Sequence, residues 1–230
     1  MGKNNKNKKV VVESGDKFTR NLTLGMVLLV LLTGVFFSFY SNNAKSSAPA
    51  PALAVKAQAL GIAPAGVVTG VPVVDIWEDF QCPVCKKFEE LNSASIKQLA
   101  AEKKITVVYH LLSFLGPESV LLANAASCAA DEGKYNEFHD LLYVSQGAEN
   151  SGIWSAESLI LAGNSIGVSS SNFKKCVTTG KYTNYLANVS AQGQKKKVTA
   201  TPTIFVDGKE LDRNTQYFDN EAFVKAVTKS

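Results

Sequence analysis

Hydrophobic and polar positions follow two different periods in the chain after residue 66. Residues 71–80 form a β-branched and aromatic run that is typical of a buried strand. Apolar side chains then recur at roughly helical spacing over residues 82–104, with charged residues between them, and residues 105–112 return to the composition of a strand. The pattern therefore predicts a strand, a helix and a second strand in succession.

Helical patterns dominate the next segment, residues 118–190. After them, the dipeptide Asp207-Gly208 between two short strand-like runs is a strong signal for a two-residue hairpin turn. Residues 219–228 are predicted to form a final helix with Asp219 as its N-terminal cap. The order of strand, helix, strand, helical block, hairpin and helix indicates an α/β domain.

A different pattern marks the N-terminal part of the chain. No charged residue occurs in the apolar segment 21–40, and the 19 residues of 22–40 would span about 28 Å as a helix, close to the thickness of a bilayer core. This length favours a transmembrane anchor over the shorter apolar region of a secretory signal peptide. A cleaved signal peptide stays open as an alternative, because small residues follow at Ala48, Ala50 and Ala52.

The charges orient this anchor and define the flanking segments. Residues 1–20 hold six Lys and Arg against two acidic residues, so this basic tail is expected in the cytoplasm and the rest of the chain outside the cell membrane. Residues 41–66 are rich in Ala, Ser and Pro and read as a flexible linker. The remainder, residues 67–230, carries a nearly balanced charge, which disfavours nucleic-acid binding.

Cysteine chemistry is the most specific signal in the sequence. Cys82 and Cys85 form a C-x-x-C motif where the first strand runs into the first helix, and Pro83 fits the first turn of that helix. Free N–H groups at a helix start stabilise a thiolate, so Cys82 is the expected attacking thiol and Cys85 the resolving one. A purely structural disulfide is the alternative. A zinc site is disfavoured, because the chain has one C-x-x-C and two isolated histidines, His110 and His139, which are expected to be structural or exposed.

Two motifs together carry a family resemblance. DIWEDFQCPVCKKF at 75–88 and VTATPTIFVDGKEL at 198–211 resemble the DsbA-like thioredoxin-fold family, in particular its membrane-tethered bacterial forms. The resemblance implies a thioredoxin fold over about residues 66–230, with the helices at about 115–190 as an insertion. It also implies a cis Thr201–Pro202 bond beside Cys82, with Thr201, Pro202, Pro83 and Val84 in contact with the substrate.

One position departs from the thioredoxin pattern. A buried carboxylate commonly lies six residues before the first cysteine in these enzymes, and this sequence has Ile76 there. Asp75 is an odd number of residues away and faces the other side of a strand, whereas Glu78 shares a face with Ile76. Glu78 is therefore the candidate proton relay for the cysteine pair.

The other two cysteines, Cys128 and Cys176, both fall in the helical block. A structural disulfide between them is the preferred interpretation, because the domain is expected outside the cell and the family resemblance implies such a bond in some relatives. Two buried free thiols and a second redox relay are the alternatives. A bond closing so long a loop would stabilise the fold by up to ~4 kcal/mol in the chain-entropy model.

The resulting hypothesis is a membrane-anchored thiol:disulfide oxidoreductase that introduces disulfides into exported proteins through Cys82 and Cys85. It needs no organic cofactor and no metal. The resemblance implies a quinone-linked membrane partner, DsbB-like or vitamin K epoxide reductase-like, that reoxidises it. The alternatives are a reductase or isomerase of the same fold, for example in cytochrome c maturation, and a non-catalytic thioredoxin-fold module that binds peptides. A monomer is expected, because the linker does not resemble a dimerisation domain.

Overall fold

The computed structural model describes residues 48–228 of the chain. From residue 73 onward, the elements follow the predicted order of strand, helix, strand, helical block, hairpin and helix. The elements are β1 (Ala54–Val55), the 3-10 helix η1 (Lys56–Gln58), β2 (Gly61–Ile62), β3 (Val73–Glu78), α2 (Pro83–Ala101), β4 (Thr106–Leu111), α3 (Pro117–Asp131), α4 (Tyr135–Val144), α5 (Ala156–Ser165), α6 (Ser171–Thr179), α7 (Thr183–Lys195), β5 (Thr203–Val206), β6 (Lys209–Glu210), α8 (Arg213–Gln216) and α9 (Asn220–Thr228).

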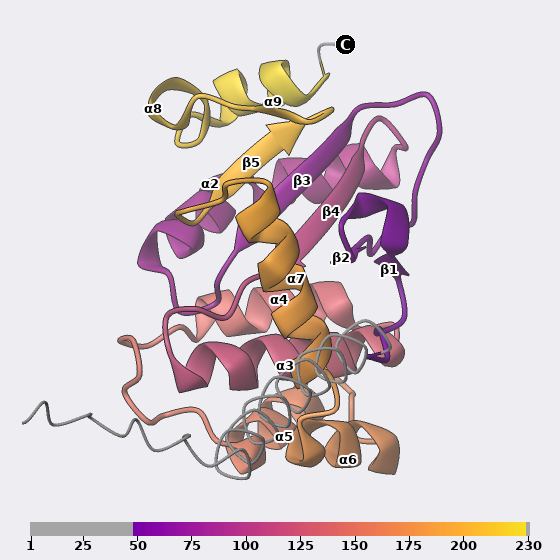
Figure 1. Cartoon of the computed structure of the whole chain (residues 1–230), viewed down its shortest axis with the longest axis vertical. Coiled ribbons are helices and arrows are strands. Elements are labelled where there is room, and N and C mark those ends of the chain that lie inside the picture. The colour runs from indigo at the N-terminus through magenta and orange to yellow at the C-terminus, as the bar shows by residue number, and fades with distance from the viewer. Residues whose placement is uncertain (1–47, 229–230) are drawn as a thin grey trace, which may run out of the picture. The chain divides into compact units, whose positions relative to one another are not determined.

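A mixed sheet with the order β1-β2-β4-β3-β5-β6 forms the centre of the domain (Figure 1). The middle strand β3 runs parallel to β4 and antiparallel to β5. Helix α2 links β3 to β4, because two parallel strands need a long crossover connection between them. Five of the six residues of β3 are buried, and these include the two acidic residues Asp75 and Glu78.

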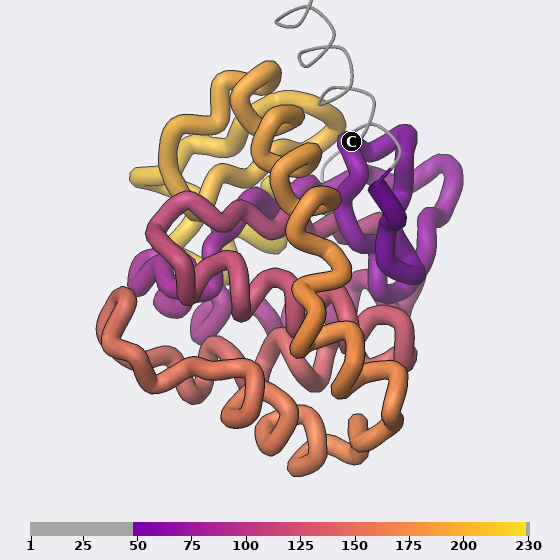
Figure 2. Tube along the Cα trace, turned by 60° about the horizontal axis from the view of Figure 1, so that its bottom comes forward, coloured from indigo at the N-terminus to yellow at the C-terminus, as the bar shows by residue number. Residues whose placement is uncertain are grey.

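Helices cover both faces of this sheet. In Figure 1, α7 crosses in front of the sheet and α2 lies behind it, with α8 and α9 beside β5. The helices α3 to α6 pack mainly on one another, and Figure 2 shows them, with α7, as one continuous excursion of the chain between β4 and β5. This is a thioredoxin fold with the helical insertion that the sequence predicts.

The predicted turn and cap at the C-terminal end are confirmed. The strands β5 and β6 pair antiparallel around Asp207-Gly208, and both of these residues have positive φ angles of 48° and 80°. Such angles suit the two central positions of a tight hairpin turn. The carboxylate of Asp219 accepts a hydrogen bond of 3.0 Å from the N–H of Ala222 at the start of α9.

The expected flexible linker over residues 41–66 is wrong for its second half. Residues 54–62 form β1, η1 and β2, and the fully buried Ile62 pairs with Tyr109 of β4 at the side of the sheet. The hydroxyl of Tyr185 on α7 donates to the carbonyl of Leu60. Local composition did not reveal this arm, because its partners lie far along the chain.

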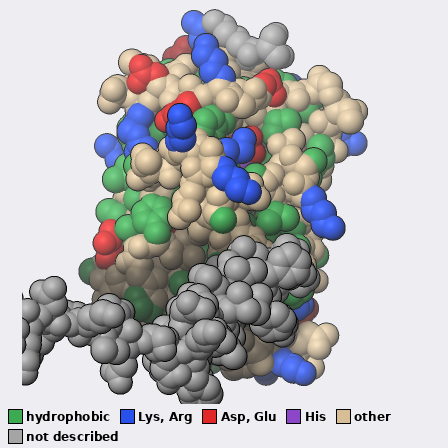
Figure 3. All heavy atoms as spheres, viewed as in Figure 1, with side chains coloured by type: hydrophobic (Ala, Val, Ile, Leu, Met, Phe, Trp, Pro, Cys, Tyr) green, Lys and Arg blue, Asp and Glu red, His purple; other side chains and the backbone are tan. Residues whose placement is uncertain are grey.

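The basic tail and the predicted membrane anchor, residues 1–40, lie outside the described residues. Within residues 48–228, no helix combines the length and the apolar character needed to cross a membrane. Lys and Arg side chains on the face drawn in Figure 3 are dispersed over several elements and interspersed with acidic ones. This distribution agrees with the nearly balanced charge of the sequence.

Candidate active site

Cys82 and Cys85 lie at the start of α2, with Cys82 as its N-terminal cap residue and Pro83 as its first residue. Both cysteines are free thiols in this structure. Cys82 is 7% exposed and Cys85 is 1% exposed, so Cys82 is the more accessible sulfur. The structure therefore shows the reduced form of the pair in the geometry that the C-x-x-C motif predicts.

The two thiols differ strongly in acidity. A hydrogen bond from the Cys85 thiol lowers the pKa of Cys82 to about 6 against the opposing effect of burial, with further help from Thr201 and the backbone N–H groups of Cys85 and Val84. Burial raises the pKa of Cys85 well above its ordinary value, and the neighbouring Cys82 and the negative charge of Glu78 add to this effect. At neutral pH the reduced pair is therefore a thiolate at Cys82 and a thiol at Cys85.

The loop before β5 lies against Cys82. The Thr201–Pro202 bond is cis, as the family resemblance implies. The Cys82 thiol donates to the carbonyl oxygen of Thr201 at 3.5 Å. Pro83 and Val84 are exposed, Val84 by 40% of its surface. The four residues predicted to contact substrate therefore all lie close to Cys82. Thr201 and Pro202 form the loop against it, and Pro83 and Val84 directly follow it in the chain.

Asp79 organises the loops around this pair. Its buried carboxylate accepts hydrogen bonds from the Ser119 hydroxyl at 2.7 Å and from the backbone N–H groups of Gln81, Phe114 and Leu115 at 3.0, 3.2 and 3.3 Å. Burial raises the pKa of Asp79 despite these bonds. One side chain thus ties the active-site turn to the loop after β4 and to the start of α3.

Glu78 lies at the centre of a buried polar network behind the cysteines. It is 1% exposed, and its carboxylate bonds to His139 Nε2 at 2.8 Å and accepts the Tyr143 hydroxyl at 3.0 Å. Burial alone would lower the pKa of His139, but the charge of Glu78, hydrogen bonds to Asp140 and Glu78, and the charge of Glu89 raise it to about 10. His139 is therefore a buried imidazolium paired with the Glu78 carboxylate.

Glu89 on α2 completes this network from a second side. It is 4% exposed, and neither of its carboxylate oxygens has a hydrogen-bond partner. Burial raises the pKa of Glu89 to about 8, against the attraction of His139. Because an unpaired buried carboxylate is costly, Glu89 is a neutral acid at pH 7. A groove of ≈ 240 Å³ between α2 and α4 leads to it from the surface.

Among the described residues, Glu78, Glu89 and His139 are also the group whose spacing would suit a metal ion. Their ligand atoms lie within 4.8 Å of one another. The positive charge of His139, bonded to Glu78 at 2.8 Å, already neutralises that carboxylate. Glu89, the third residue of the group, is neutral because it carries a proton. The network is thus electrically complete with protons alone.

A second histidine–carboxylate pair lies on the opposite face of β3. His110 Nε2 bonds to the Asp75 carboxylate at 2.7 Å, and the imidazole stacks on Trp77 with ring centroids 3.9 Å apart. Burial lowers the pKa of His110, against the effect of Asp75. The prediction that Asp75 and Glu78 face opposite sides of the strand is therefore confirmed, and neither histidine is exposed.

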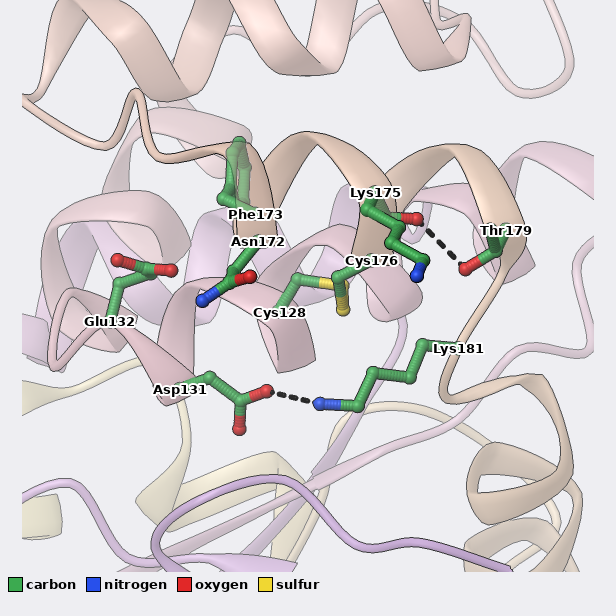
Figure 4. A pocket seen from close by; sticks show the side chains of 9 residues that line it. All are labelled: Cys128, Asp131, Glu132, Asn172, Phe173, Lys175, Cys176, Thr179 and Lys181. Carbon is green, nitrogen blue, oxygen red and sulfur yellow. Dashed lines mark hydrogen bonds and ion pairs between the residues drawn. A yellow bond between two sulfur atoms is a disulfide. The ribbon is translucent and has the colours of Figure 1, made fainter.

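Cys128 and Cys176 form the disulfide that the sequence predicts, joining α3 to α6. The bond lines an open pocket of ≈ 380 Å³ (Figure 4), where Lys181 and Asp131 form an ion pair of 2.8 Å. The pocket is on the helical insertion and contains none of the active-site residues. It is lined by Cys128, Asp131, Glu132, Asn172, Phe173, Lys175, Cys176, Thr179 and Lys181.

Sequence reasoning identified Glu78 but missed its partners. Glu89 carried a readable signal, because it follows Cys85 by four residues and so lies on the same buried face of α2. His139 and Tyr143 carried none. They reach Glu78 from positions 61 and 65 residues away along the chain.

Comparisons with known proteins agree with this site. A family model described as thioredoxin matches residues 66–226, so the chain belongs to the thioredoxin family. MdbA, a thiol-disulfide oxidoreductase from Actinomyces oris, is 29% identical, with a TM-score of 0.60 over 70% of this chain and 81% of that one. DsbA from Mycobacterium tuberculosis is 26% identical, with a TM-score of 0.59 over 71% and 88% of the two chains.

BdbD from Bacillus subtilis shares the fold at 19% identity, with a TM-score of 0.63 over 79% of this chain and 97% of that one. No curated protein matches the sequence. These similarities confirm the resemblance drawn from the two motifs. The chain is a thiol–disulfide oxidoreductase of the DsbA-like type.

Proposed function

We propose that this protein introduces disulfides into exported, cysteine-containing proteins, with Cys82 as the attacked sulfur and Cys85 as its partner. The observation that carries the proposal is the asymmetry of the reduced pair. The pKa of Cys82 is lowered to about 6, whereas that of Cys85 is raised well above its ordinary value. Stabilising the thiolate stabilises the dithiol form, and a stable dithiol makes the disulfide a strong oxidant.

The reaction begins with the enzyme in its disulfide form. A substrate thiolate attacks Cys82 Sγ, a substrate–Cys82 bond forms, and the bond to Cys85 breaks. The second substrate thiolate then attacks the substrate sulfur of this mixed disulfide, forms the substrate disulfide and releases Cys82 as a thiolate. Two electrons pass from the substrate to the enzyme, and the cysteine pair ends reduced.

Cys85 must take up a proton when it leaves, because burial strongly disfavours its thiolate. We infer that Glu78 relays this proton, as its charge acts on Cys85 and its carboxylate is bonded to the imidazolium of His139. The neutral Glu89 supplies a further proton next to that pair. The groove between α2 and α4 refills the network from solvent.

Substrate binding is proposed for the backbone of Thr201 and Pro202 and the exposed Pro83 and Val84, which surround Cys82. An extended substrate segment would pair with the loop before β5 as an added strand does. The mechanism requires no organic cofactor. The protein acts as a monomer in this proposal.

The location and the redox partner complete the proposal. The apolar segment 21–40 anchors the protein in the cell membrane, the tail 1–20 remains cytoplasmic, and the catalytic domain lies outside. A quinone-linked membrane protein, DsbB-like or vitamin K epoxide reductase-like, reoxidises the reduced pair. Expression in a host cell followed by membrane fractionation tests the anchor, because a cleaved signal would leave the domain in the soluble fraction.

The direction of electron flow is tested by the reduction potential of the full chain, equilibrated with glutathione. The proposal expects a value near about −120 to −150 mV, as for oxidases. A value near about −250 mV or lower would show that the protein donates electrons as a reductase or isomerase.

A trapping experiment separates both enzymes from a mere peptide-binding module. In Cys85→Ser, Cys82 can still form mixed disulfides but has no partner to resolve them. Exported proteins should then accumulate on Cys82 and be released by a reductant, whereas Cys82→Ser should trap none. A binding module would trap no protein through sulfur in either variant.

A further inference from the structure

The carbonyl oxygen of Thr201 receives donors from two sides. The Cys82 thiol donates to it at 3.5 Å, and Nη1 of Arg213 donates to the same oxygen at 3.4 Å. Nη2 of Arg213 donates to the next carbonyl, that of Pro202, at 2.6 Å. The guanidinium group therefore spans two successive carbonyls of the loop that lies against Cys82.

Arg213 itself is held on a firm base. Its guanidinium carbon lies 5.4 Å from the centroid of the Tyr217 ring, and Tyr217 is fully buried. The Tyr217 hydroxyl accepts the N–H of Ile204 in β5 at 2.8 Å, and its carbonyl accepts the side-chain amide of Asn92 in α2 at 2.8 Å. The arginine is thus fixed to the strand that follows the loop and to the helix that carries Cys82.

The choice of residue is also informative. Nearly all cations of this chain are lysines, and arginine occurs at positions 20 and 213 only. A planar guanidinium can donate to two neighbouring carbonyls at once, whereas a lysine ammonium acts as a single point of charge. Within the described residues, the single arginine is therefore the residue that contacts the Thr201–Pro202 loop.

We propose that Arg213 is a positioning residue for Cys82. Its guanidinium group fixes the Thr201 carbonyl and offsets the partial negative charge of that carbonyl oxygen when the neighbouring Cys82 sulfur is a thiolate. This inference rests on the proposed role of Cys82 as the attacked sulfur. Loss of the thiol proton removes a donor from the Thr201 oxygen and leaves two electron-rich atoms in contact. A cation bonded to the same oxygen compensates for both changes, and partial burial strengthens its effect.

The charged and titratable groups around Cys82 are few in the described part of the chain. Cys85 contributes a hydrogen bond from α2, and Glu78 acts on Cys85 from the end of β3. Asp79 in the same turn is engaged by Ser119 and three backbone N–H groups. Arg213, the first residue of α8, is the cation that bonds to the loop before β5.

The test uses the reduced full chain in detergent, with thiolate formation at Cys82 followed by ultraviolet absorbance across pH. Arg213→Gln removes the cation and is expected to raise the pKa of Cys82, which lowers its acid dissociation constant by about fivefold. Arg213→Lys keeps the charge without the fork and should recover part of this loss. Lys209→Gln removes an exposed cation from β6 and should leave the titration unchanged.

A second readout checks the first in the same variants. A less stable thiolate makes the dithiol less stable, so the equilibrium with glutathione should shift toward the enzyme disulfide in Arg213→Gln by about the same factor. Neither measurement uses a protein substrate, so the outcome is independent of whether the enzyme oxidises exported proteins.

A purely structural role would give a different result. Arg213→Gln would then lower the melting temperature but titrate like Lys209→Gln, and this outcome would overturn the proposal. If Arg213→Gln does not fold, Arg213→Lys decides, with folding checked by circular dichroism. A Cys82 midpoint in Arg213→Lys equal to that of the wild-type protein would then reject the inference.

Discussion

The two cysteine pairs of this domain lie in contrasting surroundings. Cys82 and Cys85 are free thiols at the start of a helix. The charge of Glu78 acts on Cys85, and Arg213 bonds to the same Thr201 carbonyl as Cys82. The second pair is bonded and joins two helices of the insertion. Its α3 member lies in a stretch of small buried residues, Ala123, Ala125, Ala126, Ala129 and Ala130.

The difference shows what makes a cysteine pair reactive. Both pairs are largely buried, so exposure alone does not distinguish them. The helix terminus and hydrogen bonds lower the pKa of Cys82, and an acid network lies behind Cys85. The bond between Cys128 and Cys176 instead closes a long loop and restricts the unfolded chain. One pair is placed for electron exchange and the other for stability.

The largest expected effect comes from removing the second pair. The double variant Cys128→Ala/Cys176→Ala should lose about 4 kcal/mol of unfolding free energy, because the long loop is no longer closed. Denaturant unfolding of the full chain measures this loss. Disulfide exchange per folded molecule should stay unchanged. A folded double variant with impaired exchange would show that Cys128 and Cys176 take part in electron transfer.

Glu78→Gln tests whether the acid network distinguishes the reactive pair. Proton delivery to Cys85 should slow by about tenfold at pH 7, because the amide of the Gln side chain cannot relay a proton. Stopped-flow reduction of the enzyme disulfide by a dithiol measures the step. Asp75→Asn is the matched control, since it alters the carboxylate–histidine pair on the other face of β3. Equal slowing in both variants would contradict a specific role for Glu78.

Alkylation should distinguish the thiols themselves. The rate of reaction of the reduced protein with iodoacetamide should rise with pH around a midpoint of about 6, the pKa of Cys82. At pH 6.5 the reaction should be roughly fivefold faster than that of an unperturbed cysteine, since the larger thiolate fraction outweighs its lower nucleophilicity. Peptide mapping should find the label on Cys82. Labelling of Cys85 first would reverse the assignment of attacking and resolving sulfurs.

The last expected effect concerns the pH dependence of stability. The pKa of Glu89 is about 8 in the folded protein against an ordinary value of 4.5, so the folded chain retains a proton that the unfolded chain releases. Stability should therefore fall as pH rises from about 4.5 to about 8. Glu89→Gln should flatten this fall and stabilise the protein at pH 8 by at least about 1 kcal/mol. An unchanged slope would show that Glu89 is not protonated in the fold.

Features encoded by neighbouring residues were predictable from the sequence. The C-x-x-C motif at a strand–helix junction, the hairpin at Asp207-Gly208 and the capping by Asp219 each depend on a few consecutive residues. The face occupied by Glu78 followed from strand alternation alone. The disulfide in the insertion followed from the number of cysteines and the expected compartment.

Features that depend on distant partners were not predictable in this way. His139 meets Glu78 from a helix 61 residues away, and Arg213 reaches Thr201 only after the chain has folded back through β5 and β6. The ordered arm at 54–62 gains its stability from β4 and α7. In each case a local pattern was compatible with an exposed or flexible residue, and only tertiary packing decided otherwise.

The strands at the two sides of the sheet have a consequence for aggregation. β1 and β6 are two residues long, and all six residues of β4 are buried. Within the described residues, the sheet therefore offers no long open edge that could serve as a template for aggregation. A substrate of the proposed reaction would therefore meet a reactive sulfur and one short loop instead of a long open strand.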